Sequence, residues 1–549
     1  MMILPLLLSL TLQSPQERMG LTPHEDALTP GYILIAPLKS KTTFLIEKTS
    51  KKVAHKWESS ELPGNSVYLM DDGDLLRTTA PGGNEVFKGG GAGGGVQRIS
   101  WEGDLIWELD WSDDTRLSHH DIEPLPNGNL LLISWEHKTA EEAFEAGRDP
   151  EYINDSGIWP DYVVEVKPPV GLEANAGEIV WEWHAWDHLV QERAPSKANY
   201  GKVAELPGRI AINGDLTIKT AAQLAREAEL EEEMKGLGYI GDDSGDDSGD
   251  DGGDGKSQEV PGAKPDTQGR QKGGDWLHTN GIDYDPIHDL IVISSRVFSE
   301  VWIIDHSTTT EEARTSEGGR FGKGGDLLWR WGNPSRYGAG DAGDQTLFKQ
   351  HDPSFIPEGS PGAGNLLIYN NGEGRPSGAY SSIVELELPL NEEGDAFPRF
   401  TDAFGPVQPA WEVGAKEGGP KLSFFSSFIS GAERLTTGNT LICVGASGRI
   451  LEVTQEGELV WEYVWPVQDL PAGRRPQGRG DRPNRPEGGG PPGKPRAGGR
   501  PGGPGGGGPG GGRGGPDLRN AIFRAIQILP SHPGIALLQN SPKPESNAD

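Results

Sequence analysis

A short phrase built around tryptophan recurs along the chain and limits the folds that this sequence can adopt. In its strict form, Gly and an acidic residue precede two apolar residues, and Trp and a charged residue follow. A glycine turn followed by apolar residues is typical of a short strand that begins after a tight turn. The strict form contains Trp107, Trp181, Trp329 and Trp461, and a looser form contains Trp57 and Trp411.

Further patterns precede the tryptophan phrase and complete a repeating unit. A turn with Gly or Asn leads into an apolar run, as at Pro126–Leu130 and Thr437–Leu441, and another strand follows, as at Tyr162–Val166. Gly and Asn turns join antiparallel strands into meanders. Each unit thus holds about four short strands, which is typical of a propeller blade. Six units predict an all-β protein, a six-bladed β-propeller, with an irregular β-sandwich as the alternative.

The two ends of the chain are expected to share one blade. The strands Tyr32–Ala36 and Thr43–Glu47 lead to Trp57, whereas Ala521–Leu529 is a strand without a tryptophan phrase after it. Pairing these segments closes the ring and removes free sheet edges. Although 549 residues suggest three or four domains, we predict one propeller domain over residues 31–530.

Two inserts interrupt the predicted propeller. Residues 471–516 hold 31 Gly or Pro out of 46, and their nine basic and two acidic residues give 9 − 2 = +7. Such a segment cannot bury apolar surface, so we predict disorder. The insert at about 194–274 contains a helical pattern over Lys219–Lys235 and then seven Asp between positions 242 and 254. We interpret this run as an acidic linker, because its spacing does not match an EF-hand calcium loop.

The net charge and the N-terminal residues indicate which partners and which cellular compartment to expect. The chain has 50 basic and 82 acidic residues, a net charge of −32, which argues against nucleic acid because phosphate binding needs a basic surface. The apolar run Ile3–Leu12 is too short to span a bilayer but has the length of a signal-peptide core, although no basic residue precedes it. We expect a signal peptide over residues 1–16, export to the periplasm or the medium, and no stable membrane insertion. A true start at Met19 would instead leave the protein in the cytoplasm.

Three of the twelve histidines fall at the same phase of the repeat. His120, His278 and His351 each stand just before the first strand of a unit. Because the first strand of each blade lines the central channel, three blades would bring one imidazole each to the same end of the axis. Arg296 ends the second strand of the His278 unit and is placed to reach the same mouth. Arg375, in the His351 unit, is a weaker candidate for binding the substrate.

Histidine serves as nucleophile, base or metal ligand. Three His are able to bind zinc, but no His-x-His or His-Glu-x-x-His spacing supports a metal site, so we predict none. His and Arg on an acidic protein favour an anionic group such as a sulfate or phosphate ester, whose oxygens Arg binds through paired hydrogen bonds. The chain has no nucleotide-binding motif, and we expect no cofactor. The run Gly89–Gly95 has no Lys or helix after it, and we interpret it as a flexible loop. The single Cys443 lies in an apolar run and is predicted to be buried.

Longer segments around these residues resemble the bacterial arylsulfotransferase family, whose members do not use a nucleotide sulfate donor. The resemblance covers most of Gly31–Trp465 apart from the acidic insert, and the two inserts are not part of the family pattern. It implies a six-bladed propeller, in agreement with the tryptophan count. The segments that carry it are HHDIEPLPNGNLLLISWE, VWEWHAWDHLVQ, DWLHTNGIDYDP, QHDPSFIP with NNGEGR, and SGAERLTTGNTLICVGASGRILEVTQEGELVWEY.

The resemblance implies a ping-pong transfer from an aryl sulfate donor to a phenolic acceptor. His351, in the QHD motif, would attack the sulfuryl group and carry it as a sulfohistidine. Asn280 and Arg296 would hold the sulfuryl oxygens. His120 and His278 would orient the group or act as acid and base. The motif register alone favours His120 over its neighbour.

Two alternatives place a different function in the same pocket. A hydrolase of sulfate or phosphate esters would use water as the acceptor. A non-catalytic propeller would bind a ligand without reaction. The sequence predicts no particular oligomeric state.

Overall fold

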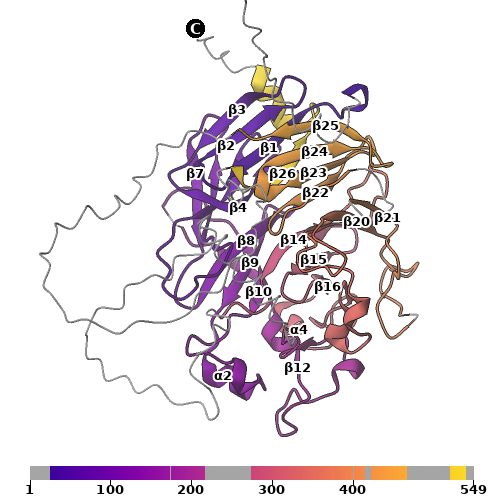
Figure 1. The fold of residues 1–549 in the computed structure, drawn as a ribbon. Helices are drawn as coiled ribbons and strands as arrows, with labels where there is room; N and C mark the ends of the chain where they lie inside the picture. Colours follow the sequence, from indigo (N-terminus) through magenta and orange to yellow (C-terminus); the bar gives the residue numbers. More distant parts are fainter. Residues whose placement is uncertain are drawn as a thin grey trace, which may run out of the picture.

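Six four-stranded antiparallel sheets surround a central axis in the computed structural model of this chain (Figure 1). The structure describes residues 25–173, 175–216, 274–399, 401–414, 422–466 and 520–539. The innermost strand of each sheet lies beside the innermost strands of two neighbouring sheets, so the ring is closed. The predicted all-β, six-bladed propeller is therefore confirmed.

We number the blades along the chain and give their strands from the axis outward. Blade I contains β4 (Leu62–Leu69), β5 (Leu75–Ala80), β6 (Gly95–Ile99) and β7 (Leu105–Asp110). Blade II contains β8 (Arg116–Pro124), β9 (Leu130–Glu136), β10 (Asp161–Lys167) and β11 (Glu178–His184). Blade III contains β14 (Thr279–Asp285), β15 (Leu290–Ser295), β16 (Glu300–Asp305) and β17 (Trp329–Trp331). Blade IV contains β18 (His351–Phe355), β19 (Leu366–Asn370), β20 (Ser382–Leu386) and β21 (Trp411–Gly414). Blade V contains β22 (Gly431–Arg434), β23 (Thr440–Val444), β24 (Arg449–Val453) and β25 (Leu459–Val464).

The sixth blade, which we call the closing blade, joins the two ends of the chain. Its inner strand β26 (Ile522–Ile528) pairs with β1 (Tyr32–Pro37), and β2 (Thr42–Glu47) and β3 (Lys52–Glu58) follow outward. The predicted sharing of a blade is thus confirmed. A buried ion pair between Lys48 and Glu452 ties this blade to blade V.

The six repeated tryptophans all lie on the outermost strands of their blades. The indole nitrogen of Trp181 donates to Thr308 Oγ1 at 3.1 Å, and the indole of Trp461 donates to Lys48 O at 3.0 Å. Each of these bonds reaches the next blade around the ring. The phrase recurs because every blade needs a large side chain that fills the wedge beside its neighbour. The indole nitrogen of Trp57 is buried without a hydrogen-bond acceptor among the described residues.

Helices are short and lie outside the blades. Among the residues that the structure describes, the α-helices are α2 (Ala140–Glu145) and α4 (Thr310–Ala313). The 3-10 helices are η1 (Glu25–Ala27), η2 (Pro150–Tyr152), η3 (Ala185–His188), η4 (Val203–Glu205), η5 (Pro334–Tyr337), η6 (Ala342–Asp344), η7 (Gly445–Ser447) and η9 (Pro533–Gln539). Within the described ranges, no helix is long and apolar enough to cross a membrane.

The first predicted insert begins with ordered structure. Strand β12 (Leu189–Val190) pairs in parallel with β13 (Ile210–Ala211), which falls within the segment predicted to be an insert. The predicted helix Lys219–Lys235, the aspartate run, the segment 471–516 and the N-terminal residues 1–16 lie outside the described residues.

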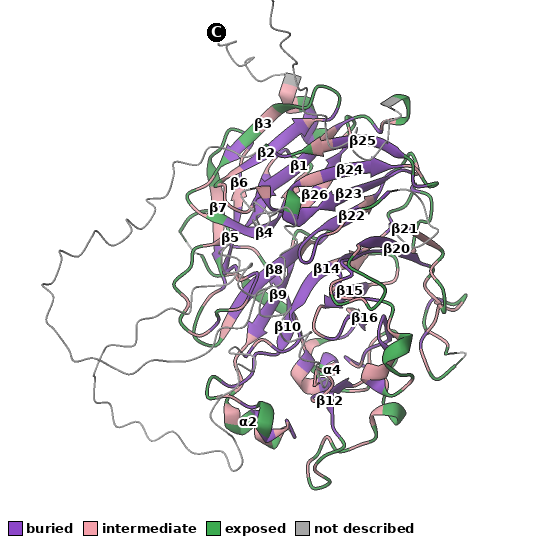
Figure 2. Ribbon diagram, viewed as in Figure 1, coloured by how far each residue is buried: buried purple, intermediate pink, exposed green. Residues whose placement is uncertain are grey.

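Buried apolar side chains fill the space between neighbouring blades. Figure 2 shows that β8, β14 and β22 are buried along most of their length, whereas α2 is largely exposed. Cys443 is buried in the cluster between blade V and the closing blade, as predicted. The inner strands are therefore a rigid support for any side chain that points into the channel.

Candidate functional site

The inner strands of blades II, III and IV each contain a β-bulge near one end of the axis. Their pairing registers shift between Ser118 and Ile122, between Thr279 and Ile282, and between His351 and Ser354. A bulge bends the strand and redirects side chains, and it is common next to active sites. His120 lies inside β8 at such a bulge, four residues after its start, and not before the strand as the sequence pattern predicted.

The backbone at these bulges adopts a conformation that non-glycine residues seldom take. The φ angles of His120, His278 and Asp352 are 55°, 52° and 52°. Such left-handed residues cost about 1–2 kcal/mol each. They persist where the surrounding contacts hold them, which is frequent at functional sites. The bulges therefore place strain at the positions that carry the histidines.

Four of the predicted side chains meet at this end of the channel. The ring centroids of His120 and His278 are 4.7 Å apart, with the planes at 67°. Arg296 directly follows β15 and is half-buried, and its charge acts on both His120 and His351. His120 and His351 are 0% and 1% exposed, so the chemistry available here takes place out of bulk water.

Two acceptors fix the ring of His351. Its Nδ1 lies 2.7 Å from Asn371 Oδ1 and 3.2 Å from Lys349 O, so Nδ1 carries the proton and donates. The amide of Asn371 is held in turn, because Nδ2 donates to Ser426 O and Ile429 O. The unprotonated Nε2 accepts from the backbone N–H of Ile429 at 3.1 Å. His351 therefore presents the nitrogen that carries a lone pair.

A chain of side chains fixes His120 in the same tautomer. Asp161 Oδ1 lies 2.8 Å from His119 Nε2, and His119 Nδ1 lies 2.8 Å from His120 Nδ1. With the carboxylate accepting from His119 Nε2–H, His119 Nδ1 accepts from His120 Nδ1–H. His119 also stacks on Trp135, with ring centroids 3.9 Å apart. His119 thus supports His120, and it is His120 that lies against His278.

His278 has a carboxylate partner of its own. Its Nδ1 lies 2.5 Å from Asp275 Oδ2. Burial acts to raise the pKa of Asp275, but the nearby His278 outweighs it and the pKa lies below its usual range. The second carboxylate, Asp161, accepts from Thr279 through both N and Oγ1, which links His278's strand to the His119 chain.

Of the three predicted histidines, the two most buried, His120 and His351, are uncharged at neutral pH. Burial, and then the charge of Arg296, lower the pKa of His351 to about 3. Burial, followed by His278, lowers the pKa of His120 well below its usual value. A neutral imidazole is the form that acts as a nucleophile or a base.

Asn280 and Arg375 are placed differently from the other candidates. Asn280 is fully buried, and its Nδ2 donates to Gln350 O at 2.8 Å, while Oδ1 has no hydrogen-bond partner among the described residues. Arg375 contacts Tyr380 and Ser382 and lies over the Tyr380 ring. The structure therefore brings Asn280 to the axis and gives Arg375 contacts within its own blade.

The glycine run at 89–95 is packed and not a flexible loop. Gly91 has φ +78°, and a Cβ added there would lie 2.2 Å from the ring of His120. Its carbonyl accepts from His120 N at 2.9 Å, and Ala92 forms an isolated bridge with His119. The glycines are needed because the backbone of blade I lies directly against the histidines of blade II. The earlier interpretation missed this, since motif spacing carries no information on contacts between blades.

Several supporting residues were also missed from the sequence, and the signals for them differ. Asn371 stands in the NNGEGR segment, and Asp275 opens the DWLH segment, so both were within reach of motif analysis. Asp161 begins a strand far from any histidine in sequence, and only the fold brings it to His119.

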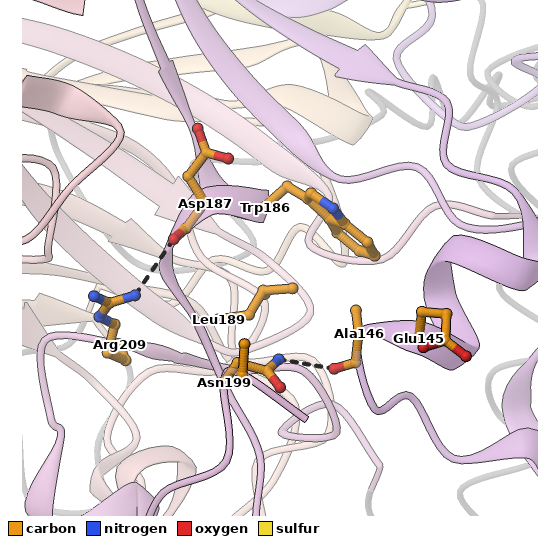
Figure 3. A pocket seen from close by; sticks show the side chains of 8 residues that line it. Glu145, Ala146, Trp186, Asp187, Leu189, Asn199 and Arg209 are labelled. Atoms are coloured by element: carbon orange, nitrogen blue, oxygen red, sulfur yellow. Dashed lines mark hydrogen bonds between the residues drawn. The ribbon is translucent and has the colours of Figure 1, made fainter. Parts of the chain in front are cut away.

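A separate cavity of about 360 Å³ lies at the edge of blade II, between α2, η3 and β12 (Figure 3). Trp186 and Leu189 line it together with Asn199 and Arg209. Arg209 donates to Asp187 O, and Asn199 donates to Ala146 O. None of the predicted site residues lines this cavity.

Among the residues that the structure describes, no group of three or more His, Cys, Asp or Glu is arranged to hold a metal ion. The three histidines point their Nδ1 atoms at protein partners and not at one another. The arrangement suits attack on, and charge stabilisation of, an anionic group.

A sequence model of the arylsulfotransferase (ASST) family matches residues 59–462. The chain belongs to the arylsulfotransferase family. Membership supports an aryl sulfotransferase activity in general, with transfer of sulfuryl groups, and it implies aryl sulfate and phenol substrates. The matched segment contains all of the predicted site residues and excludes β1 to β3 and β26.

Solved structures similar to this family member are only distantly related. A protein of unknown function from Bacteroides caccae is 12% identical, with a TM-score of 0.37, over 79% of this chain and 93% of that one. The periplasmic gluconolactonase PpgL of Pseudomonas aeruginosa is 9% identical, with a TM-score of 0.33, over 79% and 95% of the two chains. These similarities are too weak to carry an argument. A search of curated proteins finds no match.

Proposed function

We propose that this arylsulfotransferase moves a sulfuryl group from an aryl sulfate to a phenol in two steps, through a sulfohistidine at His351. The observation that carries the proposal is the state of His351. Its ring is buried and neutral, its proton is on Nδ1 facing Asn371, its Nε2 accepts from Ile429 N, and the charge of Arg296 acts on the ring. This is the arrangement that a nitrogen nucleophile needs for an anionic ester.

In the first step, the Nε2 lone pair of His351 forms a bond to sulfur, and the bond from sulfur to the aryl oxygen breaks. The phenolate leaves with the electron pair of that bond. The ring becomes an N-sulfo-imidazolium, and Nδ1–H keeps donating to Asn371 Oδ1, so no proton has to move. The Asn371 contact therefore stabilises the positive ring that forms in this step.

Charge on the sulfuryl oxygens needs donors near Nε2. Arg296 supplies a guanidinium, whose paired N–H groups suit a sulfate. The backbone N–H of Ile429, which donates to Nε2 in the structure, is next to the new N–S bond and can turn to a sulfuryl oxygen. Asn280 would have to release Gln350 O before its Nδ2 could do the same. Because its guanidinium carries a positive charge and the amide of Asn280 does not, we assign the main binding role to Arg296.

In the second step, the phenol oxygen attacks sulfur, the N–S bond breaks, and His351 regains its lone pair. The phenol proton passes to the unprotonated nitrogen of His120 or His278, whose Nδ1 atoms are already engaged. The proton is then returned to solvent, where it balances the phenolate released in the first step.

The test uses p-nitrophenyl sulfate with and without a phenol. Transfer predicts release of p-nitrophenol that depends on the phenol, and an enzyme treated with donor alone should gain the mass of one sulfuryl group on the peptide that contains His351. Phenol-independent release would identify a hydrolase. No release from a panel of aryl sulfates would indicate a ligand-binding propeller.

We also propose that the protein is exported, on the basis of the apolar run Ile3–Leu12. N-terminal sequencing of the mature protein tests this proposal. A chain that retains residues 1–16 would contradict it.

A further inference from the structure

Arg524, on the inner strand of the closing blade, lies at the axis next to the histidines. Its Nη1 lies 2.8 Å from Asp121 Oδ2 and 3.0 Å from Asp352 Oδ1, and its Nη2 lies 2.9 Å from Asp121 Oδ1. Asp121 directly follows His120, and Asp352 directly follows His351. One guanidinium therefore holds the residues next to two of the three histidines.

The contacts around Arg524 join all six blades. Its Nη2 also donates to Tyr68 of blade I. Asp121 of blade II accepts from Ile282 N of blade III at 3.4 Å. Asp352 of blade IV accepts from Ala432 N of blade V at 2.9 Å. The closing blade supplies the cation on which these contacts converge.

Close packing leaves this network little freedom to adjust. A Cβ on Gly431 would lie 2.2 Å from Asp352 Oδ2 and 3.1 Å from Arg524 Cβ. A Cβ on Gly281 would lie 3.1 Å from Asp352 N. The side chain of Arg524 is 10% exposed, and that of Asp121 is 1% exposed. Movement of the guanidinium must therefore move the carboxylates.

The backbone transmits the position of these carboxylates to the histidines. His120 and Asp352 have left-handed φ angles, so the peptide between each histidine and its aspartate lies in a strained bend. A bend of this kind persists only where contacts on both sides fix it. The ion pairs with Arg524 fix one side, and the hydrogen bonds of His119 and Asn371 fix the other.

We propose that Arg524 is a positioning residue that sets the direction of His120 and His351 through Asp121 and Asp352. The expected effect on kcat rests on the proposed function, whereas the expected effect on the orientation of the histidine rings does not. Arg524 lies outside the segment that matches the family model. The site is therefore completed by a strand that lies beyond the family pattern.

The first test compares R524M with R524K and with R434M. Arg434 forms a buried ion pair with Glu385 in blades IV and V, so R434M breaks a matched pair away from the histidines. We expect R524M to lower kcat on the order of 100-fold, because a misplacement of about 1 Å can cost that much, while the donor KM changes little. R524K should recover part of the rate, since lysine keeps the charge but lacks the fork. An R524M enzyme with wild-type kcat, or an equal loss in R434M, would overturn the proposal.

A second variant tests the proposal in case R524M does not fold. The triple variant R524M/D121N/D352N removes the guanidinium together with the charges of the two carboxylates that pair with it, so it should fold more readily than R524M. Positioning predicts that it stays slow, whereas a role in charge balance alone predicts wild-type kcat. The latter result would contradict the proposal.

A readout independent of turnover separates the two proposals. In protein labelled with ¹⁵N-histidine, the ring signals of His120 and His351 should change in R524K and stay unchanged in R434M. If the wild-type protein shows no sulfuryl transfer, the proposed function fails, and these signals still test the role of Arg524. Unchanged ring signals of His120 and His351 in R524K would refute it.

Discussion

Two groups of residues meet at the axis, and burial shifts the pKa values of their histidines and carboxylates in opposite directions. The histidine layer comprises His120, His278 and His351, and the carboxylate layer comprises Asp121 and Asp352 with Arg524. Burial lowers the pKa of His351 to about 3 and raises that of Asp121 to about 6, although Arg524 opposes the second shift. Both shifts favour the uncharged form.

The two layers differ in the partner that each receives. The Nδ1 atoms of the histidine layer contact Asn371, His119 and Asp275, and the Nε2 atom of His351 accepts from Ile429 N. The carboxylate layer receives a guanidinium. Burial alone would lower the pKa of Arg524, but Asp121 and the other acids around it raise that pKa well above its usual value, so the cation is kept. The comparison separates the layer that we propose to react from the layer that we propose to hold it in position.

The largest expected effect comes from the nucleophile. H351N should reduce kcat for phenol-dependent release of p-nitrophenol by on the order of 10³-fold or more, because loss of a nucleophile removes the covalent route. H184N is the matched control, since His184 stacks on Tyr162 in blade II, away from the layers. A variant H351N that retains more than a tenth of the wild-type rate would disprove the covalent role.

The next largest effect is expected from the hydrogen-bonded residues that support His120. D161N places an amide against His119 Nε2 and disturbs the tautomer of both histidines, so we expect kcat to fall about 10- to 100-fold. D326N is the control, because Asp326 makes a similar contact with His188 Nδ1 at 2.9 Å. Equal losses of kcat in both variants would show that removing any such carboxylate slows the enzyme, and that the hydrogen bonds from Asp161 to His120 have no special role.

The contact between blade I and the histidine layer can be tested with one methyl group. G91A should lower kcat about 10-fold or more, because the new Cβ would displace the ring of His120 and such misplacement is costly to catalysis. G82A provides the same backbone strain, with φ +75°, but nothing lies within 4 Å of its Cβ. If G82A lowers kcat as much as G91A, strain and not contact is responsible.

The histidine layer should also make the fold sensitive to acid. The pKa of His351 is about 3 in the folded protein, against about 6.5 in the unfolded chain. Below about pH 6.5 the unfolded chain therefore binds a proton that the folded protein does not, and stability falls as the pH decreases toward 3. Asp121 acts in the opposite sense, because its raised pKa stabilises the folded protein in acid and that contribution is lost as the pH rises through about 6.

Urea unfolding of wild type and H351N between about pH 4.5 and 7 measures this term. The free energy of unfolding of H351N should depend less steeply on pH, by up to about 1.4 kcal/mol per pH unit. Parallel pH profiles for the two proteins would mean that His351 is not held neutral.

The smallest effect is expected at Arg375. R375Q should change kcat by less than about threefold, because its guanidinium contacts Tyr380 and Ser382 and exposed or peripheral charges contribute little. R296Q, by contrast, should lower kcat about 100-fold, as removal of a donor to developing charge does. Equal losses would place Arg375 in the substrate site.

Much of the fold could be predicted because a large side chain, tryptophan, recurs at the same position of each repeat. Trp57, Trp181 and Trp461 mark outer strands whose indoles must reach the next blade, and this requirement recurs once per blade. Once the inner strands had been located in the sequence, His120 and His351 could be placed near the same end of the channel. Residue spacing within the repeat was sufficient for these predictions.

The rest depended on contacts between strands that are distant in sequence, most of them in different blades, and spacing does not encode such contacts. Gly91 against His120 joins blades I and II, and Arg524 joins the closing blade to blades II and IV. Asp161 reaches His119 only because β10 and β8 belong to one sheet. No local pattern distinguishes these residues from ordinary strand residues.

The placement of β26 also sets the order in which the protein can become active during synthesis. A ribosome translates blades I to V before it reaches Ile522, and until then β1 has an open inner edge and Asp121 and Asp352 have no guanidinium. Nascent chains that already contain every histidine of the site are thus incomplete. If Arg524 has the proposed role, a product that ends before Ile522 would contain the proposed nucleophile His351 but lack the residue that orients it.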